Sequence, residues 1–240
     1  SGVRVFEDAN NFNTGTGTDT LSNLTTGQGN SAFGNIALFN VTEADNNTAT
    51  GYAAGYNLTT GANNTIFGAY ALDAATTGGS NTAIGFEVLT ENTTGQENVA
   101  VGYRALDANT TGDENVAIGY VALGANTTGG NNVAVGRVSL DANTTGDKNT
   151  AVGNGTLSAS NADNNTAIGY DALALNTTGA NNVSVGYFAL RSNTTASSNT
   201  AVGFSALDAN TTGDSNTGVG RDSLGNNTTG DYNTAIGRDA

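Results

Sequence analysis

A seventeen-residue period runs through almost the whole 240-residue sequence and constrains the fold more than any other feature. The pattern N-[TV]-A-[VI]-G-x-x-A-L-x-x-N-T-T-G-x-x starts fourteen times, and every step is seventeen residues except one of sixteen. We number the positions of a repeat from its first asparagine; position one is Asn and position five is Gly in every copy. Such a period is typical of a solenoid, in which each repeat is one coil stacked on the last. The repeats start at Asn13, Asn30, Asn47, Asn64, Asn81, Asn98, Asn115, Asn132, Asn149, Asn165, Asn182, Asn199, Asn216 and Asn233.

The residues of one repeat favour a β-coil over a helical one. Seventeen residues are too few for a helix pair but suffice for two strands of about five residues and two tight turns. In residues 115–130, "NVAIG" and "YVALGA" are strand-like, whereas "NTTGG" is rich in turn formers. The sequence therefore predicts an all-β, parallel β-solenoid of 17-residue coils with two short strands per coil.

The predicted organisation is a single β-solenoid over residues 13–240, about thirteen and a half repeats, after an N-terminal cap or junction at residues 1–12. The first twelve residues, "SGVRVFEDANNF", do not fit the repeat. The sixteen-residue step falls between Asn149 and Asn165. We expect the missing residue to come from a turn, because a deletion within a strand would turn its later side chains to the opposite face.

Alternation along the strands assigns the side chains of a coil to two faces. Position ten is Asp in several coils, so the face of the second strand that includes it meets water, and the leucine at position nine points inward. The larger aliphatic residues at positions two and four then complete the core. We expect each Asn at position one to form a ladder with its counterpart one coil away. For two consecutive coils the predicted core residues are Val116, Ile118, Leu123, Val133, Val135 and Leu140.

The opposite face of the first strand is predicted to be an uncharged strip of Asn, Ala and Gly. Positions one to five contain no charged residue in any copy, although the chain has 28 charged residues. One interpretation is that three copies bury these strips around a common axis. Another is that a monomer exposes the strip as a flat plane for ice or a crystalline polysaccharide, and a third gives the strip no partner. The expected strip includes Asn115, Ala117, Gly119, Asn132, Ala134 and Gly136.

The composition argues against several classes of function. Cys and His are absent, which removes thiol nucleophiles, imidazole bases and soft metal sites, so we expect no enzyme activity and no cofactor. A formal net charge of −14 opposes binding to nucleic acid. No apolar run approaches the ~20 residues of a membrane span, so we expect no membrane insertion of this segment.

One repeated turn resembles part of a calcium loop. "DANTTGD" at Asp107–Asp113 matches the first half of an EF-hand loop, and its ligands would be Asp107, Asn109 and Asp113. Ile118 stands where such a loop has its bidentate glutamate, so a solvated turn is the simpler interpretation.

The segments "NVAIGYVAL" (115–123) and "NTAIGYDAL" (165–173) resemble the repeats of YadA-like heads in trimeric autotransporter adhesins. They are also similar to "NTAVGYxALxxNTTGxxNTA" repeats of phage tail-fibre-like and bacterial surface proteins. The resemblance covers residues 13–240. It implies a left-handed parallel β-roll, assembled as a homotrimer or longer fibre, that is extracellular on a cell surface or virion. The implied function is structural or adhesive, as the shaft or head of a fibre whose ligand is a glycan or a host surface; the alternative is the monomeric ligand-binding solenoid.

Overall fold

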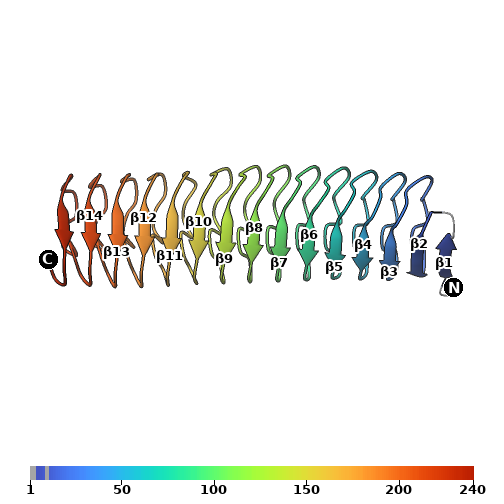
Figure 1. Ribbon diagram of the computed structural model, residues 1–240, viewed down its shortest axis with the longest axis horizontal. Helices are drawn as coiled ribbons and strands as arrows, with labels where there is room; N and C mark the ends of the chain where they lie inside the picture. The colour runs from blue at the N-terminus through green and yellow to red at the C-terminus, as the bar shows by residue number, and fades with distance from the viewer. Residues whose placement is uncertain (1–3, 9–10) are drawn as a thin grey trace. The chain divides into compact units, whose positions relative to one another are not determined.

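A computed structural model describes residues 4–8 and 11–240 of the chain, which contain strands and turns and no helix. They divide into two compact units, Ser1–Ile118 (unit 1) and Gly119–Ala240 (unit 2). Each unit is a β-solenoid (Figure 1). Unit 1 contains β1 (Arg4–Asp8), β2 (Asn13–Gly17), β3 (Ser31–Phe33), β4 (Thr48–Thr50), β5 (Thr65–Phe67), β6 (Thr82–Ile84), β7 (Val99–Val101) and β8 (Val116–Ile118). Unit 2 contains β9 (Val133–Val135), β10 (Thr150–Val152), β11 (Thr166–Ile168), β12 (Val183–Val185), β13 (Thr200–Val202), β14 (Thr217–Val219) and β15 (Thr234–Ile236).

Consecutive strands of the repeats pair in parallel, and each residue lies beside its equivalent in the next coil. In unit 1, Ala83 pairs with Ala100, and in unit 2, Ala134 pairs with Ala151. The strand β1 differs, because it pairs antiparallel with β2 on the edge that β3 leaves free. The expected cap at residues 1–12 therefore includes this strand; residues 1–3 and 9–10 lie outside the described residues.

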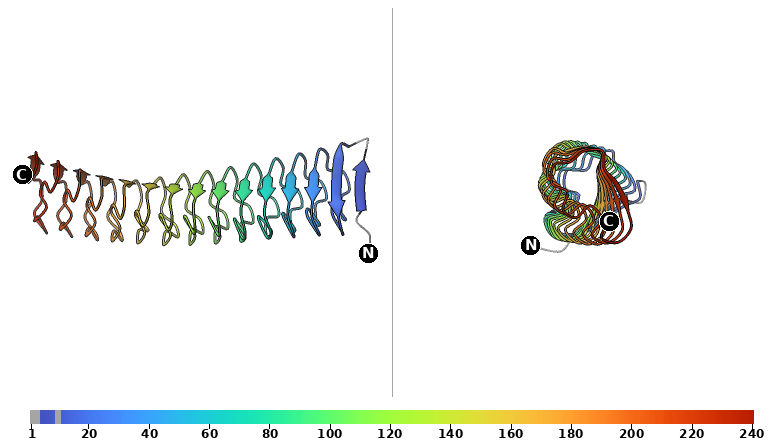
Figure 2. Two further views of the ribbon diagram at one scale, coloured as in Figure 1. Left: turned by 90° about the horizontal axis from the view of Figure 1, so that it is seen from below. Right: turned by 90° about the vertical axis from the view of Figure 1, so that its left-hand side faces the viewer.

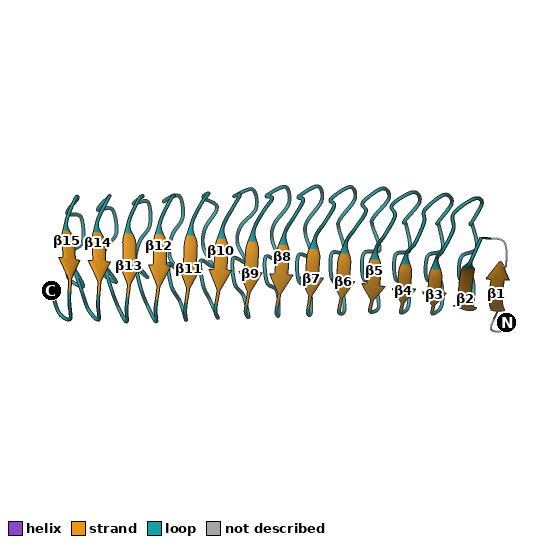
Figure 3. Ribbon diagram, in the orientation of Figure 1, coloured by secondary structure: helices purple, strands orange, loops and turns teal. Residues whose placement is uncertain are grey.

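Each coil has one strand, of three residues in all repeats after the first, and the predicted second strand is wrong. The segment at positions six to ten forms turns (Figure 3). Val121 and Leu123, at positions seven and nine, have φ angles of 53° and 53°, in the left-handed region that a strand cannot contain. The predicted parallel β-solenoid of seventeen-residue coils is confirmed.

Backbone hydrogen bonds between coils continue through these turns. In unit 1, the N–H of Leu72 donates to the carbonyl of Val88 at 2.9 Å, one coil onward. The N–H of Tyr70 donates in the other direction, to the carbonyl of Tyr52, at 2.9 Å. The loops of each unit therefore stack as regularly as its strands do (Figure 2).

The deletion in the repeat from Asn149 lies in a turn, as predicted. The strands on either side keep their register, with Ala151 beside Ala167. The shortened turn places Ser160 at position twelve, where its Oγ accepts a hydrogen bond from Nδ2 of Asn176 at 3.2 Å.

The two faces of the strand are the reverse of the prediction. Ala117 and Asn115 are fully buried inside the coil, as are Ala134 and Asn132, whereas Gly119 and Gly136 are half-buried. The Asn and Ala residues of the predicted intersubunit strip therefore lie in the interior of each coil, where no other subunit can reach them. The prediction of Val116, Ile118, Val133 and Val135 as core residues is also wrong, because these side chains point outward and Ile118 is 40% exposed. Leu123 and Leu140 are fully buried.

The narrow interior explains this reversal. The leucine at position nine fills most of the space in a coil, so position three is Ala in most repeats. One exception shows the limit on volume. Position three is Ile66 in the repeat from Asn64, and position nine of the preceding repeat is Gly55 instead of Leu. A Cβ on Gly55 would lie 2.8 Å from Cδ2 of Leu38 and 2.9 Å from Cδ1 of Ile66, so a large side chain at Gly55 competes with Ile66 for space beside Leu38.

Buried asparagines join the coils along the interior, and the predicted ladder at position one is confirmed. Nδ2 of Asn98 donates to Oδ1 of Asn81 at 3.2 Å and to the carbonyl of Gly112, across the same coil, at 2.9 Å. The backbone N–H of Asn98 also donates to Oδ1 of Asn81, at 3.0 Å. Asn98 thus bonds to the coil before it and closes its own coil.

The glycine at position five is required by both conformation and space. Gly85 has a φ of 142°, and a Cβ on it would collide with the carbonyl oxygen of Gly102 in the next coil. A residue with a side chain would therefore force two coils apart at the point where the strand ends.

We predict that Gly55→Leu destabilises the protein by roughly 1–3 kcal/mol, because the new side chain competes with Ile66 for one space. Ile66→Ala alone should cost about 2–5 kcal/mol through the cavity that it leaves. The double variant restores the usual Leu and Ala combination and should be more stable than either single variant. Urea unfolding of the four proteins measures the free energies; additive losses in the double variant would contradict a shared space.

Candidate functional site

The outward side of the strands is the most regular exposed surface of both units. We call the side chains at positions two and four of each coil the strand face. Each coil contributes one Thr, Ser or Val at position two and one Val, Ile, Phe or Thr at position four, with no charge in any coil. In unit 1 the strand face includes Thr82, Ile84, Val99, Val101, Val116 and Ile118, and in unit 2 it includes Val133, Val135, Thr166, Ile168, Val183 and Val185.

Large aliphatic side chains remain exposed along the strand face. The exposed fractions of Ile84 and Ile118 are 37% and 40%, and those of Ile168 and Val183 are 40% and 38%. Contiguous apolar patches on a soluble protein mark sites of interaction. The β-branched residues are stiff at χ1 and stand on a hydrogen-bonded sheet, so the face is ordered before any partner arrives.

Aromatic residues occupy position six in several consecutive repeats, just after the strand, and form a row. In unit 2 the rings of Tyr170 and Tyr187 stack with centroids 5.3 Å apart, and Tyr187 stacks on Phe204 at 5.3 Å. The guanidinium of Arg221 lies 5.4 Å from the Phe204 centroid. Because neighbours cover the flat faces of Tyr187 and Phe204, the row presents mainly ring edges to solvent. This arrangement stabilises the stack of coils and leaves little ring face for a sugar to cover.

Unit 1 has an acidic hollow at positions seven to eleven. Asp73, Glu87, Glu91, Asp107 and Arg104 line a volume of about 460 Å³. Arg104 forms ion pairs with Asp107 (Nη2 to Oδ2, 2.5 Å) and Glu87 (Nε to Oε2, 3.6 Å). Partial burial, together with the nearby negative charges of Glu91 and Asp107, raises the pKa of Asp73 from its ordinary value of 3.8 to about 6.

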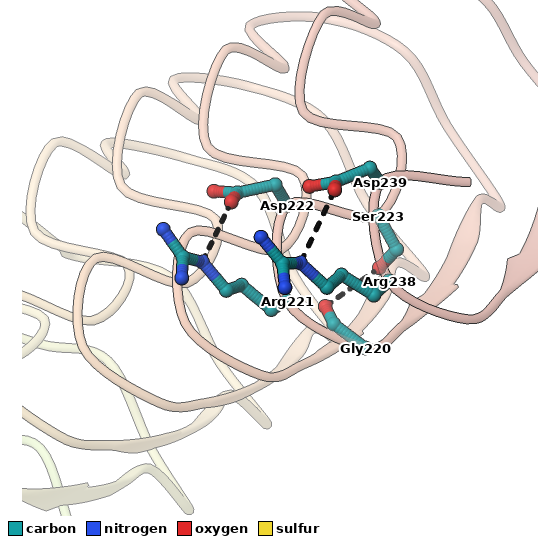
Figure 4. Close-up of polar contacts among 6 residues, drawn as sticks. All are labelled: Gly220, Arg221, Asp222, Ser223, Arg238 and Asp239. Carbon is teal, nitrogen blue, oxygen red and sulfur yellow. Dashed lines mark hydrogen bonds and ion pairs between the residues drawn. The ribbon is translucent and has the colours of Figure 1, made fainter.

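The last two repeats have paired charges at positions six and seven (Figure 4). Nε of Arg221 lies 3.0 Å from Oδ2 of Asp222, and Nε of Arg238 lies 3.2 Å from Oδ2 of Asp239. Oγ of Ser223 donates to the carbonyl of Gly220 at 3.0 Å. The ion pairs are exposed, so each contributes little to stability.

The three residues of the calcium hypothesis have separate partners. Asp107 is paired with Arg104, and Oδ1 of Asp113 accepts a hydrogen bond from the backbone N–H of Gln96 at 2.7 Å. Asn109 is fully buried, and its Nδ2 donates to Oδ1 of Asn92 at 2.9 Å. Asn109 thus belongs to a second interior asparagine ladder, at position twelve, that the analysis of the sequence missed. The regular recurrence of Asn at position twelve is the sequence pattern that indicates this second ladder.

Within residues 4–8 and 11–240, no three acidic side chains are grouped so that they could hold a metal ion. The described part of the chain also has no helix that is long and apolar enough to cross a membrane. Comparison of the sequence with protein-family models finds no match, and neither curated proteins nor solved structures give one.

We predict that the charge of Asp73 makes stability depend on pH. The folded pKa is about 6 and the ordinary value is 3.8, so the folded state binds the proton more tightly. The free energy of unfolding should therefore fall as pH rises from about 4 to 6 and stay at its lower value above that range. Asp73→Asn should be more stable than the native protein at pH 7.5, and the difference should shrink towards pH 4.

Urea unfolding at several pH values measures this difference. Glu43→Gln is the matched control, because it removes one negative charge from an exposed site of unit 1. If the profiles of Asp73→Asn and the native protein run parallel from pH 4 to 7.5, the contribution of Asp73 is refuted.

Proposed function

We propose that the chain is a structural and adhesive segment of an extracellular fibre, on a cell surface or a virion, and that it assembles as a homotrimer. The main support is the strand face, which is uncharged in all fourteen repeats of a chain with a net charge of −14. A surface that meets only water has no reason to exclude charge so consistently. Packing of the same face from three copies would cover its exposed Ile and Val side chains.

The contact in this proposal differs from the strip that the sequence predicts. The buried Ala and Asn residues close each coil, and the outward Thr, Val and Ile residues form the subunit contact. Parallel coils with one repeat length would place the same positions of each copy at the same level along the fibre. The resemblance to trimeric adhesin heads supports this assembly.

A mechanical role agrees with the bonding of the coils. Backbone and asparagine hydrogen bonds link each coil to the next, so a pulling force along a unit is shared by many parallel bonds. We propose no catalytic role and no cofactor: the chain has neither His nor Cys, and most acidic residues lie on turns that vary between repeats. The negative charge also disfavours nucleic acid as a partner.

The alternative is a monomer whose strand face binds ice or a crystalline polysaccharide. The observation that favours it is the arrangement of Thr at position two beside Val or Ile at position four, on stiff and evenly spaced strands. Rows of hydroxyl and methyl groups at constant spacing can order a layer of water. Both functions use one face, so the oligomeric state distinguishes them.

We predict a solution mass near three chains by light scattering, independent of concentration above the micromolar range. Val185→Lys should lower the mass to one chain, because it puts a charge into the proposed contact. Thr178→Lys, exposed in a turn of the same unit, is the matched control and should leave the mass unchanged. Circular dichroism should confirm that both variants are folded.

A native mass of one chain at every concentration would contradict the trimer. Inhibition of ice recrystallisation and pull-down on crystalline cellulose would then test the alternative, and Val185→Lys should weaken either activity.

A further inference from the structure

A second hollow, lined by uncharged residues, lies on unit 1, away from the strand residues. It measures about 500 Å³ and is lined by Asn23, Asn40 and Asn57 at position eleven, by threonines at position thirteen, and by Ala74. Nδ2 of Asn23 donates to Oδ1 of Asn40 at 2.9 Å, and Nδ2 of Asn40 donates to Oδ1 of Asn57 at 3.1 Å. These three amides form an exposed column about 10 Å long, at ~4.8 Å per coil. Each amide keeps a second N–H and a carbonyl lone pair for another partner.

The fold does not require this column. Position eleven is Ala in other coils of the same unit, at Ala74 and Ala108. The backbone bonds are the same with either residue: the N–H of Asn57 donates to Asp73 at 3.0 Å, and that of Ala74 donates to Thr90 at 3.1 Å. The three asparagines are therefore additions to the coil and not part of its framework.

The neighbouring position changes in the same repeats. Position twelve holds the buried asparagine ladder in most later coils, but it is Leu24, Val41 and Leu58 in the repeats that contain the exposed asparagines. Val41 and Leu58 are fully buried. In these three repeats the asparagine therefore stands one residue earlier than in the later repeats. Its amide lies on the surface instead of in the interior, so it does not help to close the coil.

The chemistry of the hollow fits a neutral ligand with many hydroxyl groups. None of the lining residues is charged, although the chain is strongly acidic. Oγ1 of Thr59 donates to the carbonyl of Thr76 at 2.7 Å, so its oxygen lone pairs and methyl group remain available. The amides supply both donors and acceptors. Apolar surface between such groups suits the alternating C–H and O–H groups of a sugar ring.

A peptide fits less well. The backbone N–H groups of Asn40 and Asn57 already donate to the adjacent coil, so there is no strand edge on which a peptide could add. The rings of Phe39 and Tyr56, which directly precede Asn40 and Asn57, stack with centroids 5.3 Å apart and stiffen this part of the coils.

We propose that this hollow binds a linear, uncharged oligosaccharide, whose hydroxyl groups pair with the amide column while its C–H groups contact the threonine methyl groups. The site is separate from the strand face, so it does not depend on the trimer and would function in a monomer or an oligomer.

The test is affinity electrophoresis of the full chain in gels with hydroxyethyl cellulose, xylan or glucomannan, followed by titration calorimetry with the hexasaccharide of whichever one retards it. The triple variant Asn23→Ala, Asn40→Ala, Asn57→Ala should bind at least about tenfold more weakly, because it removes every amide of the column. It should still fold, since Ala occupies position eleven in other coils. Asn35→Ala, an exposed amide at position six, is the matched control and should bind as the native protein does.

A gain-of-function variant keeps the test decisive if the triple variant is poorly folded. Ala74→Asn lengthens the column by one coil and should tighten binding. The proposal is overturned if no neutral polysaccharide retards the native protein, or if the folded triple variant binds equally well. It is also overturned if an uncharged Ser- and Gln-rich peptide binds the hollow and the sugars do not, or if only polygalacturonate binds.

Discussion

Hydrogen bonding between successive coils is the interaction on which the rest of the structure depends. Backbone groups in the strands and in the turns bond to the coil before or after, and the buried asparagines add side-chain bonds in the same direction. Such bonding requires that equivalent atoms of consecutive coils lie at one level. Deletion of one residue within a strand would turn the later side chains of that strand to the opposite face, whereas the shortened turn after Asn149 is tolerated because β10 and β11 keep their pairing.

The narrow interior is a second constraint, and it decides which surface is exposed. A coil of seventeen residues with one buried Leu has room for Ala at position three and little more, as the exchange between Gly55 and Ile66 shows. The aliphatic residues at positions two and four must then point outward. The exposed strand face is thus a consequence of interior volume, and its exclusion of charge is the feature that packing inside the coil does not explain.

The period, the β-solenoid and the ladder at position one could be predicted from the sequence because each follows from a repeated residue at fixed spacing. The orientation of the strand could not, since period-two alternation gives two faces without saying which one is inside. Hydrophobicity alone predicts that the larger aliphatic residues lie inside, and the limit on volume that overrides this prediction is visible in the sequence only where Ile66 replaces Ala. The absence of the second strand could not be predicted either. Val121 and Leu123 are residue types that favour strands, but here they adopt positive φ angles that such residues rarely show.

The same reasoning separates residues that build the coil from those that do not. Positions one, three, five, nine and, in the later repeats, twelve are set by hydrogen bonding, space or backbone conformation. Their recurrence therefore carries no information about ligands. Asn109 illustrates this, because its place in a calcium-like motif is explained by the interior ladder. Asn23, Asn40 and Asn57 are the opposite case: they are exposed or half-buried, they depart from the repeat, and other coils have Ala at their position with equivalent backbone hydrogen bonds. In a repeat protein the informative residues for binding are those that the stacking of coils leaves unexplained.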